Sequence, residues 1–284
     1  MPGLIRVKIN GKECEAEKGE YILEVARRNK IFIPGLCHHE ALSGLGCCRL
    51  CVVEVNEEGK PRVVVSCVYP LDKDCEVYTE SEKIKRVRRN ILAMLRGRAP
   101  QSSRIASLCE MYGAPDDTRF SFSPAAADNS AAAGGAADPG AALDAAKNRM
   151  LTSCILCGLC AEACARLGSG AISSVGRGVN KKISTPYDEA SPDCIGCGSC
   201  AAVCPTGAVE CTEQDGIRVI WGRAFELVRC ENCGTPFATK EEIARAMTES
   251  GSEQPGAETL LCENCRRGKS SGVLAAVFGD RVSR

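Results

Sequence analysis

"SCILCGLCAEACAR" at residues 153–166 and "DCIGCGSCAAVCPTG" at residues 193–207 are the stretches that decide the fold of this chain. Each run has the spacing C-x2-C-x2-C-x3-C, at Cys154, Cys157, Cys160 and Cys164 and again at Cys194, Cys197, Cys200 and Cys204. Thiolate sulfur is a soft ligand that selects zinc, copper(I) and iron–sulfur clusters. Structural zinc sites use separate C-x2-C pairs, so continuous runs of four favour iron–sulfur clusters.

The spacing also predicts which cysteines share a cluster. It is that of two-cluster bacterial ferredoxins, in which the fourth cysteine of each run ligates the other cluster. We therefore expect a first four-iron site on Cys154, Cys157, Cys160 and Cys204, and a second four-iron site on Cys194, Cys197, Cys200 and Cys164, each holding a [4Fe–4S] cluster. Pro205 follows the second run as this pattern expects, whereas Ala165 takes the corresponding place after the first.

The composition favours metal ligation over disulfides. The chain has 284 residues with 36 basic and 36 acidic side chains, so its charge gives no reason to expect nucleic acid or a membrane surface as a partner. Residues 1–20 lack the apolar core of a secretion signal, and no window approaches the roughly 18 apolar residues of a membrane span. We therefore predict a cytoplasmic protein without direct membrane insertion, in which clustered cysteines are metal ligands.

Residues 1–80 are predicted to form a β-rich module with a site of its own. Residues 4–19 predict a β-hairpin around "NGK", "EYILEVARRNK" predicts a helix, and residues 51–55 and 62–68 predict two more strands. A two-iron site is expected at Cys37, Cys48, Cys51 and Cys67, whose spacing resembles that of plant-type [2Fe–2S] proteins with a longer first interval. Cys47 is the alternative to Cys48, which we favour because it pairs with Cys51 as C-x2-C. His38 and His39 are expected beside the ligands rather than among them.

Two segments are expected to connect this module to the cysteine runs. Residues 81–97 predict a helix capped by Ser81, and its basic residues are expected on a solvated face rather than against RNA. The packed face of that helix is expected to carry Ile84, Val87, Ile91 and Leu95. Residues 123–148 consist mainly of Ala, Gly, Ser, Pro and Asp, a composition that predicts a flexible linker.

A further cysteine set lies near the C-terminus. Cys230, Cys233, Cys262 and Cys265 form two C-x2-C pairs, which resemble a zinc-ribbon or rubredoxin-like site. We favour one metal ion here, zinc first, and a further iron–sulfur cluster is the alternative. A module this small would take its folding energy from the metal.

These segments predict an α+β chain of five parts. The parts are a β-grasp [2Fe–2S] ferredoxin domain at 1–80, a helical connector at 81–122, an Ala/Gly-rich linker at 123–148, a two-[4Fe–4S] ferredoxin domain at 149–213, and a four-cysteine metal module with the C-terminal tail at 214–284.

Three stretches carry a specific resemblance to a known family. "PGLCHHEALSGLGCCRLCVVEV" (34–55), "SCVYPL" (66–71) and "SVGRGVNKKISTPYDEASPDCIGCGSCAAVCPTGA" (174–208) resemble the iron–sulfur domains of the large iron–sulfur subunit of complex I, of NAD-linked hydrogenases and of iron-only hydrogenases. The resemblance covers about residues 4–95 and 149–212. It implies a chain that carries electrons between a flavin- and NAD(P)-binding subunit and a catalytic subunit such as a hydrogenase or formate dehydrogenase.

The chain departs from that family in two places. Many relatives have a His-x3-Cys-x2-Cys-x5-Cys site between the two modules, where this chain has Cys109 alone and no histidine. We expect that cluster to be missing and the resulting gap to be spanned by a neighbouring subunit. Nothing after residue 212 resembles a hydrogen-activating or molybdopterin domain, so catalysis is expected in a partner.

The sequence therefore predicts an electron-transfer subunit of an NAD(P)H-linked oxidoreductase complex, with an electron-bifurcating complex included in this class. No glycine-rich loop lies in a strand–turn–helix unit, so NAD and flavin are assigned to a partner rather than to this chain. A free-standing polyferredoxin-like carrier and an iron–sulfur redox sensor are the alternatives.

Overall fold

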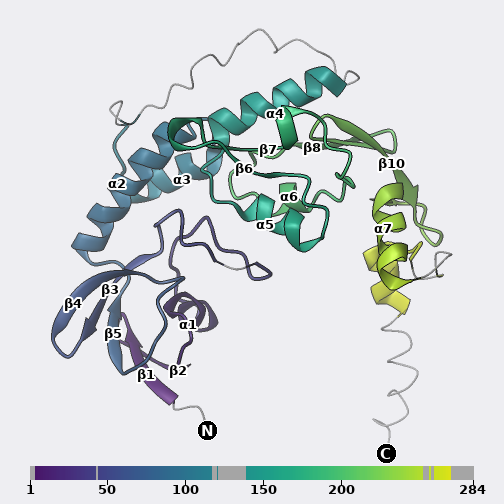
Figure 1. The fold of residues 1–284 in the computed structure, drawn as a ribbon. Coiled ribbons are helices and arrows are strands. Elements are labelled where there is room, and N and C mark those ends of the chain that lie inside the picture. The colour runs from purple at the N-terminus through teal and green to yellow at the C-terminus, as the bar shows by residue number, and fades with distance from the viewer. Residues whose placement is uncertain are drawn as a thin grey trace, which may run out of the picture.

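The N-terminal module is built on a five-stranded sheet in this computed structural model, which describes residues 4–42, 44–116, 120, 139–251, 256 and 259–269 (Figure 1). The sheet consists of β1 (Leu4–Ile9), β2 (Lys12–Glu17), β3 (Val52–Glu57), β4 (Lys60–Val65) and β5 (Cys75–Tyr78). Their order is β2-β1-β5-β3-β4, with β1 and β5 parallel and the other neighbours antiparallel. Helix α1 (Ile22–Arg28) buries one face in a core shared with the sheet. The first hairpin, the helix and β3 follow the prediction. Strand β5 was not predicted, because its four residues are too few to show the alternation of apolar and polar side chains that marks a strand.

Within the part of the chain that the structure describes, four hairpins close through two-residue turns of one type. The turns are Asn10-Gly11, Glu58-Gly59, Asp215-Gly216 and Trp221-Gly222, and every one of these residues has a positive φ. The flanking residues pair directly, as in Ile9 with Lys12 and Ile220 with Arg223. Positive φ at both central positions defines the type I′ turn, whose twist suits antiparallel strands. Asn-Gly and Asp-Gly are its preferred sequences, so Trp-Gly is the unusual member.

Helices α2 (Glu82–Arg98) and α3 (Ser103–Tyr112) follow the sheet. Ser81 caps α2 as predicted, its hydroxyl oxygen accepting from the Ile84 N–H at 3.4 Å. The most buried stripe of α2 runs through Ile84, Arg88 and Leu92, while the expected Val87, Ile91 and Leu95 are half-buried. The expectation that all basic residues of this helix face solvent is wrong for Arg88, which is fully buried.

Part of the segment expected as a linker is helical. Helix α4 spans Pro139–Ser153, so residues 139–148 lie in a helix, and residues 123–138 lie outside the described residues. Alanine has the highest helix propensity, and proline suits the first helical position. The same alanines that suggested a segment without a core therefore favour this helix.

The remaining elements build the two cysteine runs and a second sheet. The runs lead into α5 (Leu159–Arg166) and α6 (Ser199–Ala202), with the small strands β6 (Ser173–Val175) and β7 (Lys182–Ser184) between them. A four-stranded sheet follows in the order β11-β10-β9-β8, made of β8 (Cys211–Gln214), β9 (Ile217–Ile220), β10 (Arg223–Arg229) and β11 (Pro236–Thr239). Helix α7 (Lys240–Ser250) continues directly from β11. The boundary expected at residues 213–214 thus falls inside β8.

One apolar cluster joins the N-terminal module to the cysteine runs. It combines Leu36 and Leu50 of the N-terminal module, Leu92 and Leu108 of the connecting helices, and Leu159 of α5. The connector is therefore part of a continuous core. Among the described residues, no helix has the length and apolarity needed to cross a membrane.

Candidate metal centres

The four cysteines of the two-iron site come together as two adjacent pairs. Cys37 faces Cys48, whose N–H donates to Cys37 Sγ at 3.3 Å, and Cys51 faces Cys67. Within each pair the thiol–thiol contact raises the pKa of one member, Cys37 or Cys67, and lowers that of the other. All four side chains are buried. Two pairs of thiolates fit a two-iron cluster, in which each iron takes two cysteines.

Cys47 stands apart from this set. Its side chain is exposed, whereas that of Cys48 is buried. Cys48 rather than Cys47 therefore lies with the other three cysteines.

His38 lies beside this set. Its ring is held by Arg27, whose Nη1 lies 2.8 Å from His38 Nδ1, and burial lowers the pKa of His38.

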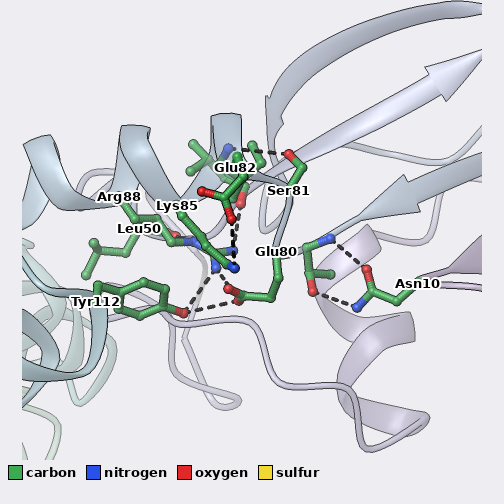
Figure 2. Close-up of polar contacts among 11 residues, drawn as sticks. Asn10, Leu50, Glu80, Ser81, Glu82, Lys85, Arg88 and Tyr112 are labelled. Carbon is green, nitrogen blue, oxygen red and sulfur yellow. Dashed lines mark hydrogen bonds and ion pairs between the residues drawn. The ribbon is translucent and has the colours of Figure 1, made fainter.

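A buried guanidinium holds the loop that carries Cys51. Arg88 Nε donates to Leu50 O at 3.1 Å and Arg88 Nη2 to Val52 O at 2.8 Å, so the carbonyls on both sides of Cys51 are bound (Figure 2). Arg88 Nη1 pairs with Glu80 Oε1 at 2.6 Å, which supplies the counter-charge. Arg88 thus fixes the backbone of a predicted ligand from a neighbouring helix.

Sequence reasoning missed Arg88 because it grouped all the basic residues of the helix together. The available signal was spacing, since positions 84, 88 and 92 repeat every four residues and share one helix face. A buried arginine must be paired and hydrogen-bonded, which is why its partners are two carbonyls and a carboxylate.

The cysteines of the first four-iron site surround a tight loop. Leu156 and Gly158 have φ values of 57° and 80°, which turn the chain sharply within the run. The Leu156 N–H donates to Cys154 Sγ at 3.3 Å. Burial raises the pKa of Cys157 to about 12, and the nearby thiols of Cys154 and Cys204 act in the same direction. Cys204 packs against the apolar cluster that contains Cys154 and Cys160, which is where the predicted crossed pairing would put it.

The cysteines of the second four-iron site line a single cavity. It is bordered by Cys164, Cys194, Cys197 and Cys200 together with Ser169 and Trp221. Ser169 Oγ lies 3.1 Å from Cys164 Sγ, so a hydroxyl meets one of these sulfurs. Cys200 and Cys160 of the first site belong to one apolar cluster, so the two cysteine sets lie side by side. Four soft thiolates around one enclosed space fit a four-iron cluster.

The two-iron site and the first four-iron site lie in contact. Cys37, Cys48 and Cys157 belong to the same apolar cluster. A methyl group added at Gly158 would meet Leu45 Cδ1 at 3.0 Å, so the two cysteine loops touch there. The expectation of a gap between the modules is therefore wrong. That expectation assumed that the absence of the histidine-containing site leaves the two modules apart. Instead, residues of α2 and α3 pack with both modules in one apolar cluster.

Cys109 is a buried thiol in this connection rather than part of a ligand set. Its Sγ donates to Leu92 O at 3.8 Å, and burial raises its pKa. The side chain therefore serves as a small apolar group between α2 and α3.

The C-terminal cysteines form a tighter group. The sulfurs of Cys230, Cys233, Cys262 and Cys265 all lie within 4.8 Å of one another, and Cys233 Sγ and Cys262 Sγ are 3.7 Å apart. The Cys262 N–H donates to Cys230 Sγ at 3.3 Å, and Asn232 Nδ2 donates to Cys265 Sγ at 3.2 Å. A tetrahedral zinc with Zn–S bonds of about 2.3 Å holds its sulfurs about 3.8 Å apart. A four-iron cluster spreads its thiolates over four irons, so this spacing fits one ion better.

Two family models match the segments that contain the two-iron and the four-iron cysteine sets. The family model described as a "2Fe-2S iron-sulfur cluster binding domain" matches residues 4–82, and the model described as a "4Fe-4S dicluster domain" matches residues 153–208. The chain thus contains both kinds of ferredoxin domain, and the C-terminal cysteine group lies outside both matches.

Three of the relatives are subunits of oxidoreductases or hydrogenases. The NADP-reducing hydrogenase subunit HndD of Solidesulfovibrio fructosivorans is 30% identical over 217 residues, covering 72% of this chain and 36% of the relative. The NADPH-Fe(3+) oxidoreductase subunit alpha of Geobacter sulfurreducens is 31% identical over 215 residues, covering 72% and 24%. The NADH-ubiquinone oxidoreductase 75 kDa subunit of Reclinomonas americana is 28% identical over 216 residues, covering 72% and 29%. These matches confirm the family resemblance, and the chain spans about a third or less of each relative's length.

Proposed function

We propose that this chain is the electron-transfer subunit of a multisubunit NAD(P)H-linked oxidoreductase. It would pass electrons between a flavin- and NAD(P)-binding subunit and a catalytic subunit such as a hydrogenase or formate dehydrogenase. The two-iron site would hold a [2Fe–2S] cluster, and the two four-iron sites would each hold a [4Fe–4S] cluster. When bound, such clusters supply one-electron transfer at potentials that the protein tunes.

One observation carries this proposal: the three predicted ligand sets lie next to one another in a single packed body. Cys48 and Cys157 share one apolar cluster, and Cys160 and Cys200 share another. An electron path needs closely spaced centres, whereas a sensor needs one labile cluster. The arrangement therefore favours a carrier of electrons over a redox switch.

The protein's own residues bind, orient and shield the sites. Arg88 holds the carbonyls around Cys51, and tight left-handed turns aim backbone N–H groups such as that of Leu156 at sulfur. N–H···S bonds of this kind stabilise thiolates and adjust cluster potentials. The sheet order β2-β1-β5-β3-β4 with α1 beside it supports a β-grasp assignment for residues 1–80.

We also propose one zinc ion at the C-terminal site, on Cys230, Cys233, Cys262 and Cys265. The support is the spacing of the four sulfurs, which all lie within 4.8 Å. Zinc is redox-inert, so this site would stabilise its own segment rather than extend the electron path. A reducing, cytoplasmic setting suits a chain whose 21 cysteines are all free.

The deciding experiment is iron, sulfide and zinc analysis with electron paramagnetic resonance (EPR) on anaerobically purified full-length chain. About ten irons, one [2Fe–2S] signal, two interacting [4Fe–4S] signals and one zinc are expected. About fourteen irons without zinc would make the C-terminal site a further cluster. A protein that contains zinc but no iron would contradict the electron-transfer role.

The alternative of a diffusible polyferredoxin-like carrier has its own test. A resident subunit is expected to co-purify with a flavoprotein from the native source under mild conditions. Isolation as a lone monomer that reduces several unrelated acceptors at similar rates would favour the carrier.

A further inference from the structure

Trp221 occupies a position that its own backbone disfavours. It forms, with Gly222, the two-residue turn between β9 and β10, and its φ is 51°. The other three turns of this type place Asn10, Glu58 and Asp215 at the same position. A bulky side chain in the left-handed region is uncommon, and such strain persists where the surroundings hold it for a functional reason. Trp221 is also the single tryptophan of the chain.

The indole of Trp221 has an unused donor at the second four-iron site. The residue is 4% exposed, and its ring borders the same cavity as the four cysteines of that site. Among the described residues, Trp221 Nε1 has no hydrogen-bond partner of normal geometry although it is buried. A buried tryptophan N–H normally finds an acceptor, because leaving it unpaired is costly.

The acceptor available to this N–H is sulfur. Trp221 and Cys200 belong to the same apolar cluster and border the same cavity, so the thiol of Cys200 lies on the side that the indole lines. Ser169 Oγ already lies 3.1 Å from Cys164 Sγ on the same site. Side-chain donors thus approach two of the four sulfurs.

Several contacts hold the hairpin that carries Trp221 against the loop of the second cysteine run. Arg223, two residues after Trp221, donates from Nη1 to Cys194 O at 2.6 Å, and its guanidinium lies 4.7 Å from the centre of the Phe225 ring. Arg218 Nη1 donates to Gly196 O at 2.8 Å. The hairpin that carries Trp221 is therefore bound to the backbone of the second cysteine run on both sides.

We propose that the indole N–H of Trp221 donates a hydrogen bond to a sulfur of the cluster in the second four-iron site, at or beside Cys200 Sγ, and thereby raises the reduction potential of that cluster. This inference rests on the proposed function, because it requires a cluster at this site. A donor to sulfur stabilises the reduced form, which carries one more negative charge. Arg223 also places positive charge at this loop, whereas the charge of Arg218 is paired with Glu213 at 2.8 Å.

The direct test uses the single tryptophan as a spectroscopic label. Full-length chain is produced with 15N at the indole nitrogen and reduced anaerobically, and pulsed electron–nuclear double resonance is recorded on both four-iron signals. We expect a 15N hyperfine coupling on one signal and its absence in unlabelled protein. Absence of the coupling from both signals would overturn the inference.

The second test is the variant Trp221→Phe, which keeps an aromatic ring and removes the N–H. In a redox titration followed by EPR, the signal that carries the 15N coupling should become about tenfold harder to reduce, a shift of about 59 mV for one electron. The other four-iron signal and the two-iron signal should keep their potentials. Asp215→Asn, at the matching position of a neighbouring turn, is the control and should shift none of them.

The outcomes separate the inference from the function on which it rests. If wild-type chain yields no four-iron signals, the proposed function fails. If both signals appear and neither shows 15N coupling or a shift in Trp221→Phe, the function stands and the role of Trp221 is overturned. If Trp221→Phe fails to fold, the labelled wild-type chain still decides.

Discussion

Arg88 connects the stability of a helix to the geometry of a metal ligand. Its guanidinium is fully buried and binds the carbonyls of Leu50 and Val52 at once. Arg88→Lys should lower the free energy of unfolding by about 3 kcal/mol, because a lysine cannot span both carbonyls and leaves buried groups unpaired. Denaturant unfolding followed by the visible absorbance of the two-iron site measures this. Arg86→Lys, exposed on the same helix, is the control, and equal losses in both variants would contradict the role given to Arg88.

Cys47 and Cys48 are adjacent in sequence and opposite in environment. Cys47 is exposed, whereas Cys48 is buried against Cys37. Cys48→Ser should therefore abolish or strongly alter the [2Fe–2S] EPR signal, while Cys47→Ser should leave its intensity and shape unchanged. Loss of the signal in Cys47→Ser alone would reverse the assignment.

Sequence spacing could identify the cysteines, because all of them would serve the same purpose as thiolate ligands. The cysteine runs were predictable because cluster ligation demands four thiolates at short, fixed intervals. Trp221 was not predictable in this way, and for Arg88 the spacing could indicate burial alone, because the partners of both side chains come from distant segments. A basic residue in a helix and a tryptophan before a glycine carry no local sign of the carbonyls and sulfurs that they meet.

Among the helices and strands, capping and turn chemistry proved more informative than composition. Ser81 marked the start of α2, and Asn10-Gly11 marked the first hairpin. The Ala-rich segment misled at residues 139–148, since a composition too poor to form a core can still form a helix that packs on its neighbours. Local signals predict where elements begin and end, whereas burial of an element depends on what it packs against.

The segment from β11 to α7 should depend on the C-terminal metal. The core there is small, with Leu261 and Phe237 packed around the cysteines, so the metal would supply much of the folding energy. Removing zinc with a strong chelator should speed amide hydrogen exchange in β11 and α7 by at least tenfold. Exchange in β1 and β3, and the iron–sulfur EPR signals, should not change. Unchanged exchange in β11 and α7 after complete loss of zinc would show that the site does not stabilise this segment.

In the described part of the chain, the three predicted cluster sites follow one another through shared apolar clusters. The connecting helices α2 and α3 lie between the N-terminal sheet and the elements of the cysteine runs (Figure 1). One apolar cluster contains cysteines of the two-iron site and of the first four-iron site. Arg166 reinforces this contact, since its Nη1 donates to Ala41 O at 2.9 Å. The order of centres would then follow from packing alone, without a contribution from a neighbouring subunit between these two sites.

Gly158 and Gly198 allow this contact to be tested with a matched pair. They occupy the same place in the two runs with φ of 80° and 73°, but an added methyl group meets Leu45 at 3.0 Å only at Gly158 and finds ordinary contact at Gly198. Both alanine variants should be strained by the left-handed backbone, and Gly158→Ala should cost about 1 kcal/mol more because it also overpacks the contact. Thermal unfolding measures the difference, and magnetic coupling between the [2Fe–2S] and [4Fe–4S] signals should weaken only in Gly158→Ala. Adding Leu45→Ala should remove the excess cost and restore the coupling, since the clash ends at that side chain. Equal costs for the two glycines, with coupling unchanged, would mean that the two loops do not press together in solution.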